Sequence, residues 1–162
     1  MDSAGLIAVK ARIADPVAFA PFGDLIASPR SLPNIDFSTA LDNQRAGART
    51  TLYTTVVEPV ALPVTLEKME RHRFSSQTFL PLEASRYLVC VAPHNRKGLP
   101  DPAALQAFIV PAGVGITYRG NVWHHPMMAL DRRASFAVVM WRDGSAGDEE
   151  FVDLAAPLRV EA

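Results

Sequence analysis

Short runs of β-branched and aromatic residues, interrupted every few positions by Pro, Gly, Asn or Asp, recur along most of this chain. Such runs favour strands, and their close spacing is typical of an all-β sandwich or barrel. The chain also holds 13 prolines, which are tolerated at turns and strand edges but not inside helices. We therefore expect an all-β fold with strands over residues 50–57, 64–69, 77–82, 86–91, 105–110, 115–118, 136–141 and 151–154.

Helices are expected only as short pieces. Asp15 followed by Pro16 is a helix start signal, and a proline and a glycine end that helix about one turn later. A single helical turn is expected over residues 102–105, and the polar stretch 28–49 is typical of a loop. Because no repeat or linker interrupts the pattern, we expect one domain over residues 1–162.

The composition argues against several classes of partner. The chain has 16 basic and 17 acidic residues, so it lacks the basic surface that nucleic acid or an anionic membrane requires. It has no apolar run long enough for a bilayer, and its start lacks the features of a secretory leader. Its single cysteine, Cys90, lies in an apolar run and is expected to be a buried small hydrophobic residue. We expect a cytoplasmic protein that binds a small molecule.

The segment most suggestive of chemistry is residues 118–126, which places two of the four histidines after a glycine-containing turn. Histidine is well suited to proton transfer near neutral pH and is also the commonest metal ligand. Successive side chains of a strand point to opposite faces, so His124, rather than His125, is expected to share a cavity with Tyr118. The alternative is that one histidine is a core residue bonded to the backbone.

A second polar segment, Glu70, Arg71 and His72, is followed by Ser-Ser-Gln at residues 75–77, which leads into the next expected strand. An arginine here, Arg71 or Arg73, could bind a substrate carboxylate through two parallel hydrogen bonds. The spacing does not distinguish between the two arginines. The alternative is that these charges form a solvated strand edge.

Other polar segments offer less. His94 is expected on an exposed turn, and residues 143–144 and 147–150 are expected to form a solvated acidic loop. The sequence contains no phosphate-binding glycine-rich loop, no cysteine ligand cluster and no nucleophile elbow.

The spacing also resembles the two motifs of a cupin barrel, with the matching residues His72, Gln77, Pro111, Gly113 and His124. Metal-binding cupins typically offer three imidazoles and one carboxylate, whereas this chain has glutamine at the acidic position. An amide is a poorer ligand than imidazole for divalent transition metals. We therefore expect any divalent metal (Ni, Zn or Mn) bound by His72, Gln77 and His124 to be weakly held.

Over nearly its whole length the chain is similar to the ureidoglycolate lyase family. The matching segments are residues 18–24, 43–44 with 49, 62–65, 70–72, 76–82, 91–93, 107–108, 113–115 and 118–126. The last of these is the most specific. The chain departs from the usual family pattern at Arg73, Val114 and Thr117.

The resemblance implies a cupin-like β-barrel (a double-stranded β-helix), usually a homodimer, that cleaves ureidoglycolate to glyoxylate and urea in allantoin degradation. His124 would be the base or a metal ligand, and Arg71 would hold the substrate carboxylate. Glu70 is a weaker candidate, for orienting a histidine. The expected catalytic residues are His124, His72 and Tyr118, and the expected substrate-binding residues are Arg71, Gln77, Ser76 and His125.

Two alternatives stay open at this point. One is a different cupin enzyme, such as a metal-dependent isomerase or oxygenase acting on another small oxyacid. The other is a non-catalytic barrel that uses the same pocket to recognise a carboxylate metabolite.

Overall fold

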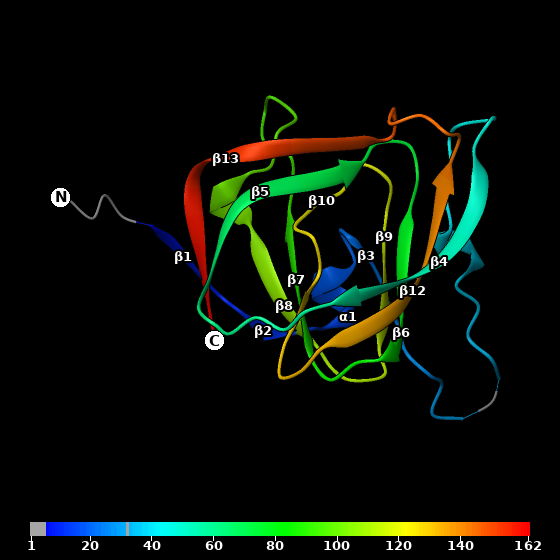
Figure 1. The fold of residues 1–162 in the computed structure, drawn as a ribbon, viewed down its shortest axis with the longest axis horizontal. Helices are drawn as coiled ribbons and strands as arrows, with labels where there is room; N and C mark the ends of the chain where they lie inside the picture. The colour runs from blue at the N-terminus through cyan, green and yellow to red at the C-terminus, as the bar shows by residue number, and fades with distance from the viewer. Residues whose placement is uncertain (1–5, 32) are drawn as a thin grey trace.

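The computed structural model describes residues 6–31 and 33–162, and strands are its main secondary structure (Figure 1). Residues 1–5, which were expected to lack the features of a secretory leader, lie outside the described residues. The strands are β1 (Ile7–Lys10), β2 (Arg12–Ile13), β3 (Gly23–Ile26), β4 (Arg49–Val57), β5 (Val64–His72), β6 (Gln77–Glu83), β7 (Tyr87–Ala92), β8 (Gln106–Val110), β9 (Gly115–Tyr118), β10 (Trp123–His124), β11 (Met128–Ala129), β12 (Ala134–Arg142) and β13 (Glu149–Glu161).

The helical pieces are short, as expected. Helix α1 (Pro16–Phe19) begins at Asp15, whose side chain accepts hydrogen bonds from two backbone N–H groups of the first turn. The turn η2 (Pro102–Ala104) is also confirmed, and a further turn, η1 (Ser38–Ala40), lies in the expected loop. No helix of the described residues is long and apolar enough to cross a membrane.

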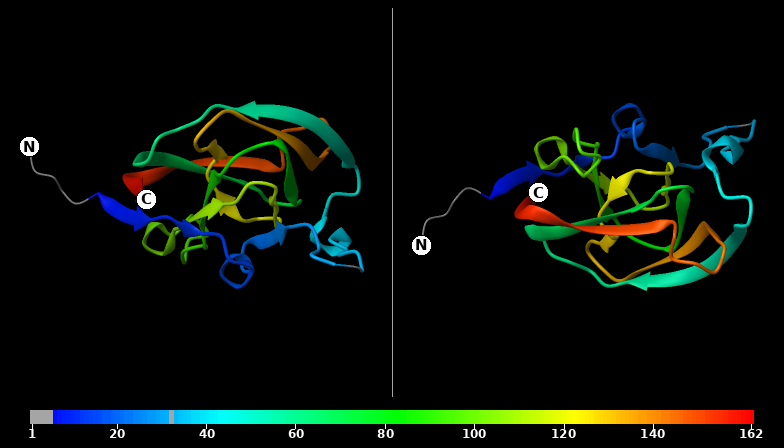
Figure 2. Two further views of the ribbon diagram at one scale, coloured as in Figure 1. Left: turned by 90° about the horizontal axis from the view of Figure 1, so that it is seen from below. Right: turned by 90° about the horizontal axis from the view of Figure 1, so that it is seen from above.

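An eight-stranded sheet closes on itself through the N-terminal segment. Its strand order is β1-β13-β5-β10-β7-β8-β2, with β11 added beside β7. Strand β1 pairs in parallel with β13, and β2 pairs in parallel with β8. Because β1 and β2 are separated only by Ala11, whose N–H bonds to Glu161, one continuous segment joins the two ends of the sheet (Figures 1 and 2).

A five-stranded sheet, in the order β3-β9-β6-β12-β4, packs against this first sheet. Side chains of β7 alternate between two apolar cores: Val89 and Val91 face the five-stranded sheet, whereas Leu88 and Cys90 point to the other side. The expected burial of Cys90 is confirmed, and burial raises the pKa of its thiol to about 12. The all-β fold expected from the sequence is present.

Two strands are longer than the sequence pattern predicts. Strand β5 extends to His72, three residues beyond the expected end, because the polar end of the strand pairs with β13. Strand β13 runs over 13 residues where only 151–154 were expected. Its exposed side chains and a register irregularity between Asp153 and Leu158 conceal the strand pattern.

One glycine is required where β3 meets β9. A Cβ atom built on Gly23 would lie 1.8 Å from the backbone oxygen of Thr117, and Gly23 is the pairing partner of Tyr118. No side chain can be accommodated there unless the two strands separate.

We predict that Gly23→Ala destabilises the protein by about 3 kcal/mol or more, since overpacking against backbone cannot be relieved by a rotamer change. Gly47→Ala is the matched control, because its Cβ would have no neighbour within 4 Å and should change stability by less than about 0.5 kcal/mol. Urea denaturation of both variants measures the difference. Equal stabilities would contradict the predicted clash.

Candidate functional site

Strand β5 divides its polar residues between the two faces of the sheet. Glu70 and His72 lie on the face that is directed at the five-stranded sheet, while Arg71 between them points to the opposite face. Arg71 donates to Glu150 at 2.7 and 2.9 Å, and its guanidinium lies 4.3 Å from the ring centre of Trp123. Alternation along the strand therefore separates the arginine from the histidine.

Strand β10 brings His124 opposite Glu70. The turn before it includes Asn121, which has a positive φ of 68°, and whose N–H donates to the carbonyl of His72. His124 Nδ1 lies 2.9 Å from the carbonyl oxygen of Val122, which can only accept, so Nδ1 carries the proton. The other ring nitrogen, Nε2, lies 3.4 Å from Glu70 Oε1.

Four of the expected site residues come together on this face. The rings of Tyr118 and His124 are stacked with centres 4.1 Å apart, and those of His72 and His124 are 5.8 Å apart. Gln77 pairs with Tyr118 across β6 and β9. The structure thus places His72, Gln77, Tyr118 and His124 in one buried cluster, which we call the inner cluster.

The inner cluster is notable for its unsatisfied polar atoms. Buried polar groups in proteins are almost always hydrogen-bonded, and each exception calls for an explanation such as a bound ligand. Five buried atoms of these four residues have no hydrogen-bond partner in the described chain: His72 Nδ1, His72 Nε2, Gln77 Oε1, Tyr118 Oη and His124 Nε2. Together they offer both donors and acceptors to a small polar molecule.

Burial shapes the protonation of the cluster. Burial, with a further contribution from the nearby His124, lowers the pKa of His72 below its ordinary value. Burial raises the pKa of Tyr118 far above its ordinary value, so its phenol stays protonated. Burial alone would raise the pKa of Glu70, but the nearby rings of His124, His72 and His125, when protonated, together lower it. Glu70 is therefore a carboxylate at neutral pH.

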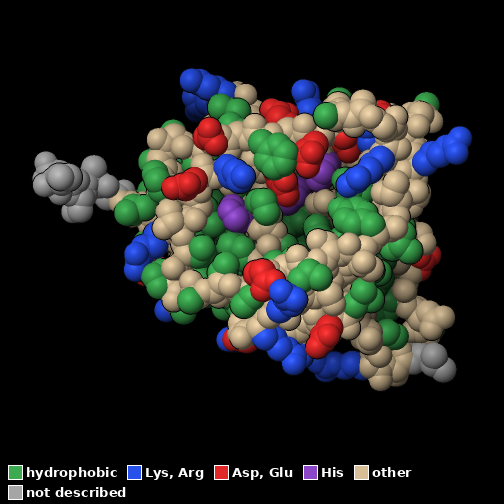
Figure 3. Space-filling view, in the orientation of Figure 1, with side chains coloured by type: hydrophobic (Ala, Val, Ile, Leu, Met, Phe, Trp, Pro, Cys, Tyr) green, Lys and Arg blue, Asp and Glu red, His purple; other side chains and the backbone are tan. Residues whose placement is uncertain are grey.

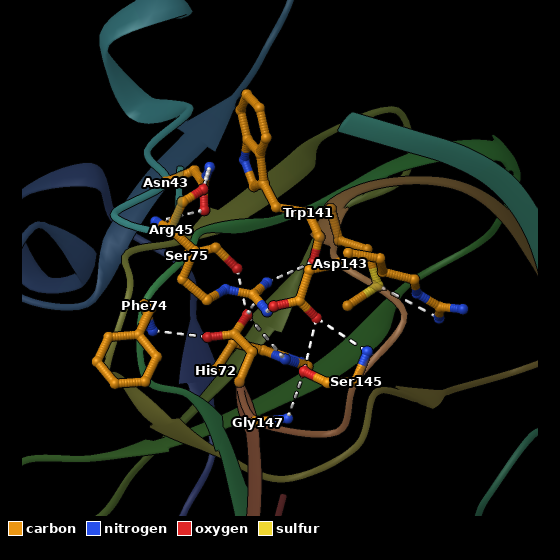
Figure 4. Close-up of polar contacts among 12 residues, drawn as sticks. Asn43, Arg45, His72, Phe74, Ser75, Trp141, Asp143, Ser145 and Gly147 are labelled. Carbon is orange, nitrogen blue, oxygen red and sulfur yellow. Dashed lines mark hydrogen bonds and ion pairs between the residues drawn. The ribbon is translucent and has the colours of Figure 1, made fainter. Parts of the chain in front are cut away.

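The acidic residues 143–150 include a buried carboxylate that we did not expect. Asp148 is 5% exposed and accepts hydrogen bonds from Phe74 N–H at 2.7 Å and from the Ser75 hydroxyl. Arg45 bridges it to Asp143, at 3.3 Å from Asp148 Oδ2 and 2.9 Å from Asp143 Oδ2 (Figure 4). The expectation of a wholly solvated acidic loop is wrong for this position.

Arg45 was not a candidate, because the stretch 28–49 has no periodic pattern. Its sequence does contain one usable signal: an arginine after Asn43, whose side chain accepts from Arg45 N–H and stabilises a local turn. That signal predicts a turn, but it does not predict the ion-pair partners of Arg45, Asp143 and Asp148, which lie about a hundred residues further along the chain.

Three other expected site residues are engaged outside the inner cluster. The hydroxyl of Ser76 accepts from Asp42 N–H at 2.9 Å. His125 is half-buried and its Nδ1 lies 2.7 Å from the carbonyl of Pro126. Arg71 is bound to Glu150 as described above, and Arg73 is exposed.

A pocket of about 410 Å³ opens beside the inner cluster. His72 lines this pocket and also belongs to the cluster, so it lies between the two. The space-filling view shows histidine side chains reaching the surface among acidic and basic groups in the middle of one face (Figure 3). The pocket is lined by Arg45, His72, Met140, Trp141, Arg142, Gly144, Ser145, Ala146, Asp148 and Glu149.

The donor set does not fit a tight site for a divalent transition metal. Over residues 6–31 and 33–162, no group of three or more His, Cys, Asp or Glu side chains is placed to hold a metal ion. Two imidazoles and the amide of Gln77 are a weak set for Ni, Zn or Mn. The weakly held metal stays a prediction, and no chemical step is derived from it.

Comparison with known proteins identifies relatives of the whole chain. A family model described as ureidoglycolate lyase matches residues 7–161. A putative ureidoglycolate lyase of Agrobacterium fabrum is 36% identical, over 94% of this chain and 94% of its own length. The ureidoglycolate lyase of Rhizobium etli is 38% identical, over 83% and 85% of the two chains, and that of Burkholderia cepacia is 39% identical, over 75% and 73%.

Among solved structures, a dTDP sugar isomerase from Desulfovibrio desulfuricans has a TM-score of 0.50 at 16% identity. The match covers 83% of this chain and 84% of that one. At this identity the likeness concerns the fold alone, and it confirms the cupin-like barrel.

The lowered pKa values predict how stability changes with pH. Burial is the main cause of the lowered pKa of both His72 and His125. Below about pH 6.5 the unfolded chain binds protons that the folded chain does not, so the free energy of unfolding should fall on acidification. Urea denaturation at about pH 7.5 and about pH 5.5 measures this, and His72→Gln should reduce the fall. Stability that is constant or rises on acidification would contradict the prediction.

Proposed function

The chain belongs to the ureidoglycolate lyase family, and on that premise we propose that it is an enzyme that cleaves ureidoglycolate to glyoxylate and urea in allantoin degradation. The observation that carries the proposal is the set of unpartnered polar atoms in the inner cluster. A small molecule with a carboxylate, a hydroxyl and a ureido group on one carbon can satisfy such a set. Neither another small-oxyacid enzyme nor a carboxylate-binding barrel is favoured by the relatives.

His124 is proposed as the general base. In the reaction the substrate hydroxyl loses a proton, the C–N bond breaks as the C=O of glyoxylate forms, and the departing urea nitrogen gains a proton. Because Nδ1–H is bound to the carbonyl of Val122, Nε2 is the nitrogen that can accept the hydroxyl proton and later donate it to the urea nitrogen. The Glu70 carboxylate, 3.4 Å from Nε2, stabilises the imidazolium that forms between these transfers.

Tyr118, His72 and Gln77 are proposed to bind the substrate. The phenol of Tyr118 remains protonated and can donate to a substrate oxygen beside His124. Gln77 offers an unpartnered carbonyl oxygen to the N–H groups of the ureido group. Since Arg71 is held on the other face of β5, the arginine near the substrate carboxylate is Arg45, which lines the same pocket as His72.

The functional unit is proposed to be a homodimer that uses the outer face of the five-stranded sheet. Strand register places Leu52 of β4 beside Val139 of β12, and Leu80 of β6 beside Ala137 on the same face. Leu52 is 72% exposed, and such an apolar face is a common sign of association. Strand β11, which lies close to the histidines, is buried core and does not contribute to this surface.

We predict that His124→Gln lowers kcat by about 10²–10⁴-fold, the usual contribution of general acid–base catalysis. His125→Gln should keep near-normal turnover, because its side chain is bound at Pro126. The measurement is glyoxylate release, corrected for spontaneous decay of the substrate, with circular dichroism to check folding. Unchanged turnover in both variants, or a greater loss at His125, would move the base elsewhere.

We predict that light scattering gives a dimer mass for the wild type, and that Leu52→Glu shifts it to a monomer. Val17→Glu, at an exposed position on α1, is the matched control and should remain dimeric. A wild-type monomer at all concentrations would refute the dimer. Dissociation by both variants, or by neither, would show that the outer face of the five-stranded sheet is not the interface.

A further inference from the structure

The turn between β5 and β6 connects two members of the inner cluster, since His72 ends one strand and Gln77 begins the next. Asp148 holds this turn at three consecutive residues. Its backbone carbonyl accepts from Arg73 N–H at 2.8 Å, and its carboxylate accepts from Phe74 N–H and from the Ser75 hydroxyl. A buried carboxylate thus lies beside the strand end that carries His72.

The carboxylate of Asp148 also faces the ring of His72. Oδ1 accepts from Phe74, and Oδ2 accepts from Ser75 and from Arg45. Oδ2 also lies 3.9 Å from His72 Nδ1, slightly too far for a hydrogen bond. At that distance the negative charge of Asp148 still attracts an N–H group and repels the lone pair of an unprotonated ring nitrogen.

We propose that Asp148 is a positioning residue, which holds His72 in the tautomer with Nδ1–H directed at its carboxylate and Nε2 free to face the substrate. The proposal rests on the proposed function only for the identity of that substrate. Asp148 acts through His72 and does not itself contact the reacting atoms.

Electrostatics supports orientation rather than proton transfer between the two groups. Burial favours neutral His72, so the choice is between two neutral tautomers. Arg45 offsets the charge of Asp148, yet the carboxylate oxygen can only accept, and it therefore selects the tautomer with the proton on Nδ1. The rival acceptor is the side-chain oxygen of Gln77, which neighbours His72 and would select a proton on Nε2 if it faced that nitrogen.

Two variants separate these possibilities. Asp148→Asn removes the charge and replaces one acceptor oxygen by a donor. Asp143→Asn is the matched control: it makes the same chemical change beside the same Arg45, but Asp143 does not touch the turn that carries His72. The readout that does not depend on turnover is nitrogen NMR of the His72 ring in the full-length protein without ligand, at a pH where the ring is neutral.

We expect the wild type and Asp143→Asn to show the proton on Nδ1, and Asp148→Asn to shift it toward Nε2. Asp148→Asn should lower kcat for ureidoglycolate by about 10–100-fold, as for other residues that orient a functional histidine, with little change in KM. Asp143→Asn should change kcat by less than about threefold, as expected for a partly exposed ion pair.

A proton on Nε2 in the wild type, or an unchanged ring spectrum in Asp148→Asn, would overturn the proposal. If Asp148→Asn does not fold, the wild-type spectrum still decides. If the wild type does not cleave ureidoglycolate, the proposed function fails while the spectra continue to test the positioning of His72.

Discussion

Alternation of side chains along β5 is the constraint on which both the packing and the site depend. Met69 enters the core of the closed sheet and Arg71 packs over Trp123 on the same side, while Glu70 and His72 face the other sheet. A shift of one residue in the register of this strand would exchange the two sets. The strand would then bury an arginine in the site and a histidine in the apolar core. Pairing with β13 over eight positions opposes such a shift.

The polar groups buried in the inner cluster compensate one another only in part. Glu70 and His124 face each other, and Tyr118 covers the imidazole with its ring. Leaving the remaining nitrogen and oxygen atoms without partners costs stability, since an unsatisfied buried group loses its hydration. Hydrogen bonds to the proposed substrate would recover that cost.

Much of the fold and part of the site could be predicted because they depend on local patterns. Runs of β-branched residues predicted β4, β6 and β12, and the parity of Tyr118 and His124 placed both side chains on one face. The network of Arg45 and Asp148 could not be predicted, because 103 positions separate the two residues and no local pattern connects them. Arg71 is expected at the substrate because guanidinium chemistry suits a carboxylate, and only the strand pairing shows that it lies beside Glu150, on the face opposite His72.

The continuous segment that carries β1 and β2 has a consequence for association between chains. It pairs with residues 158–161 of β13 and with residues 108 and 109 of β8, so it covers part of the outer side of each strand. If that segment detached, two open edges would become available at once, and open edges invite pairing with strands of other molecules. Closure of the sheet thus protects the protein from forming intermolecular sheets, at the same time as it encloses one of its two cores.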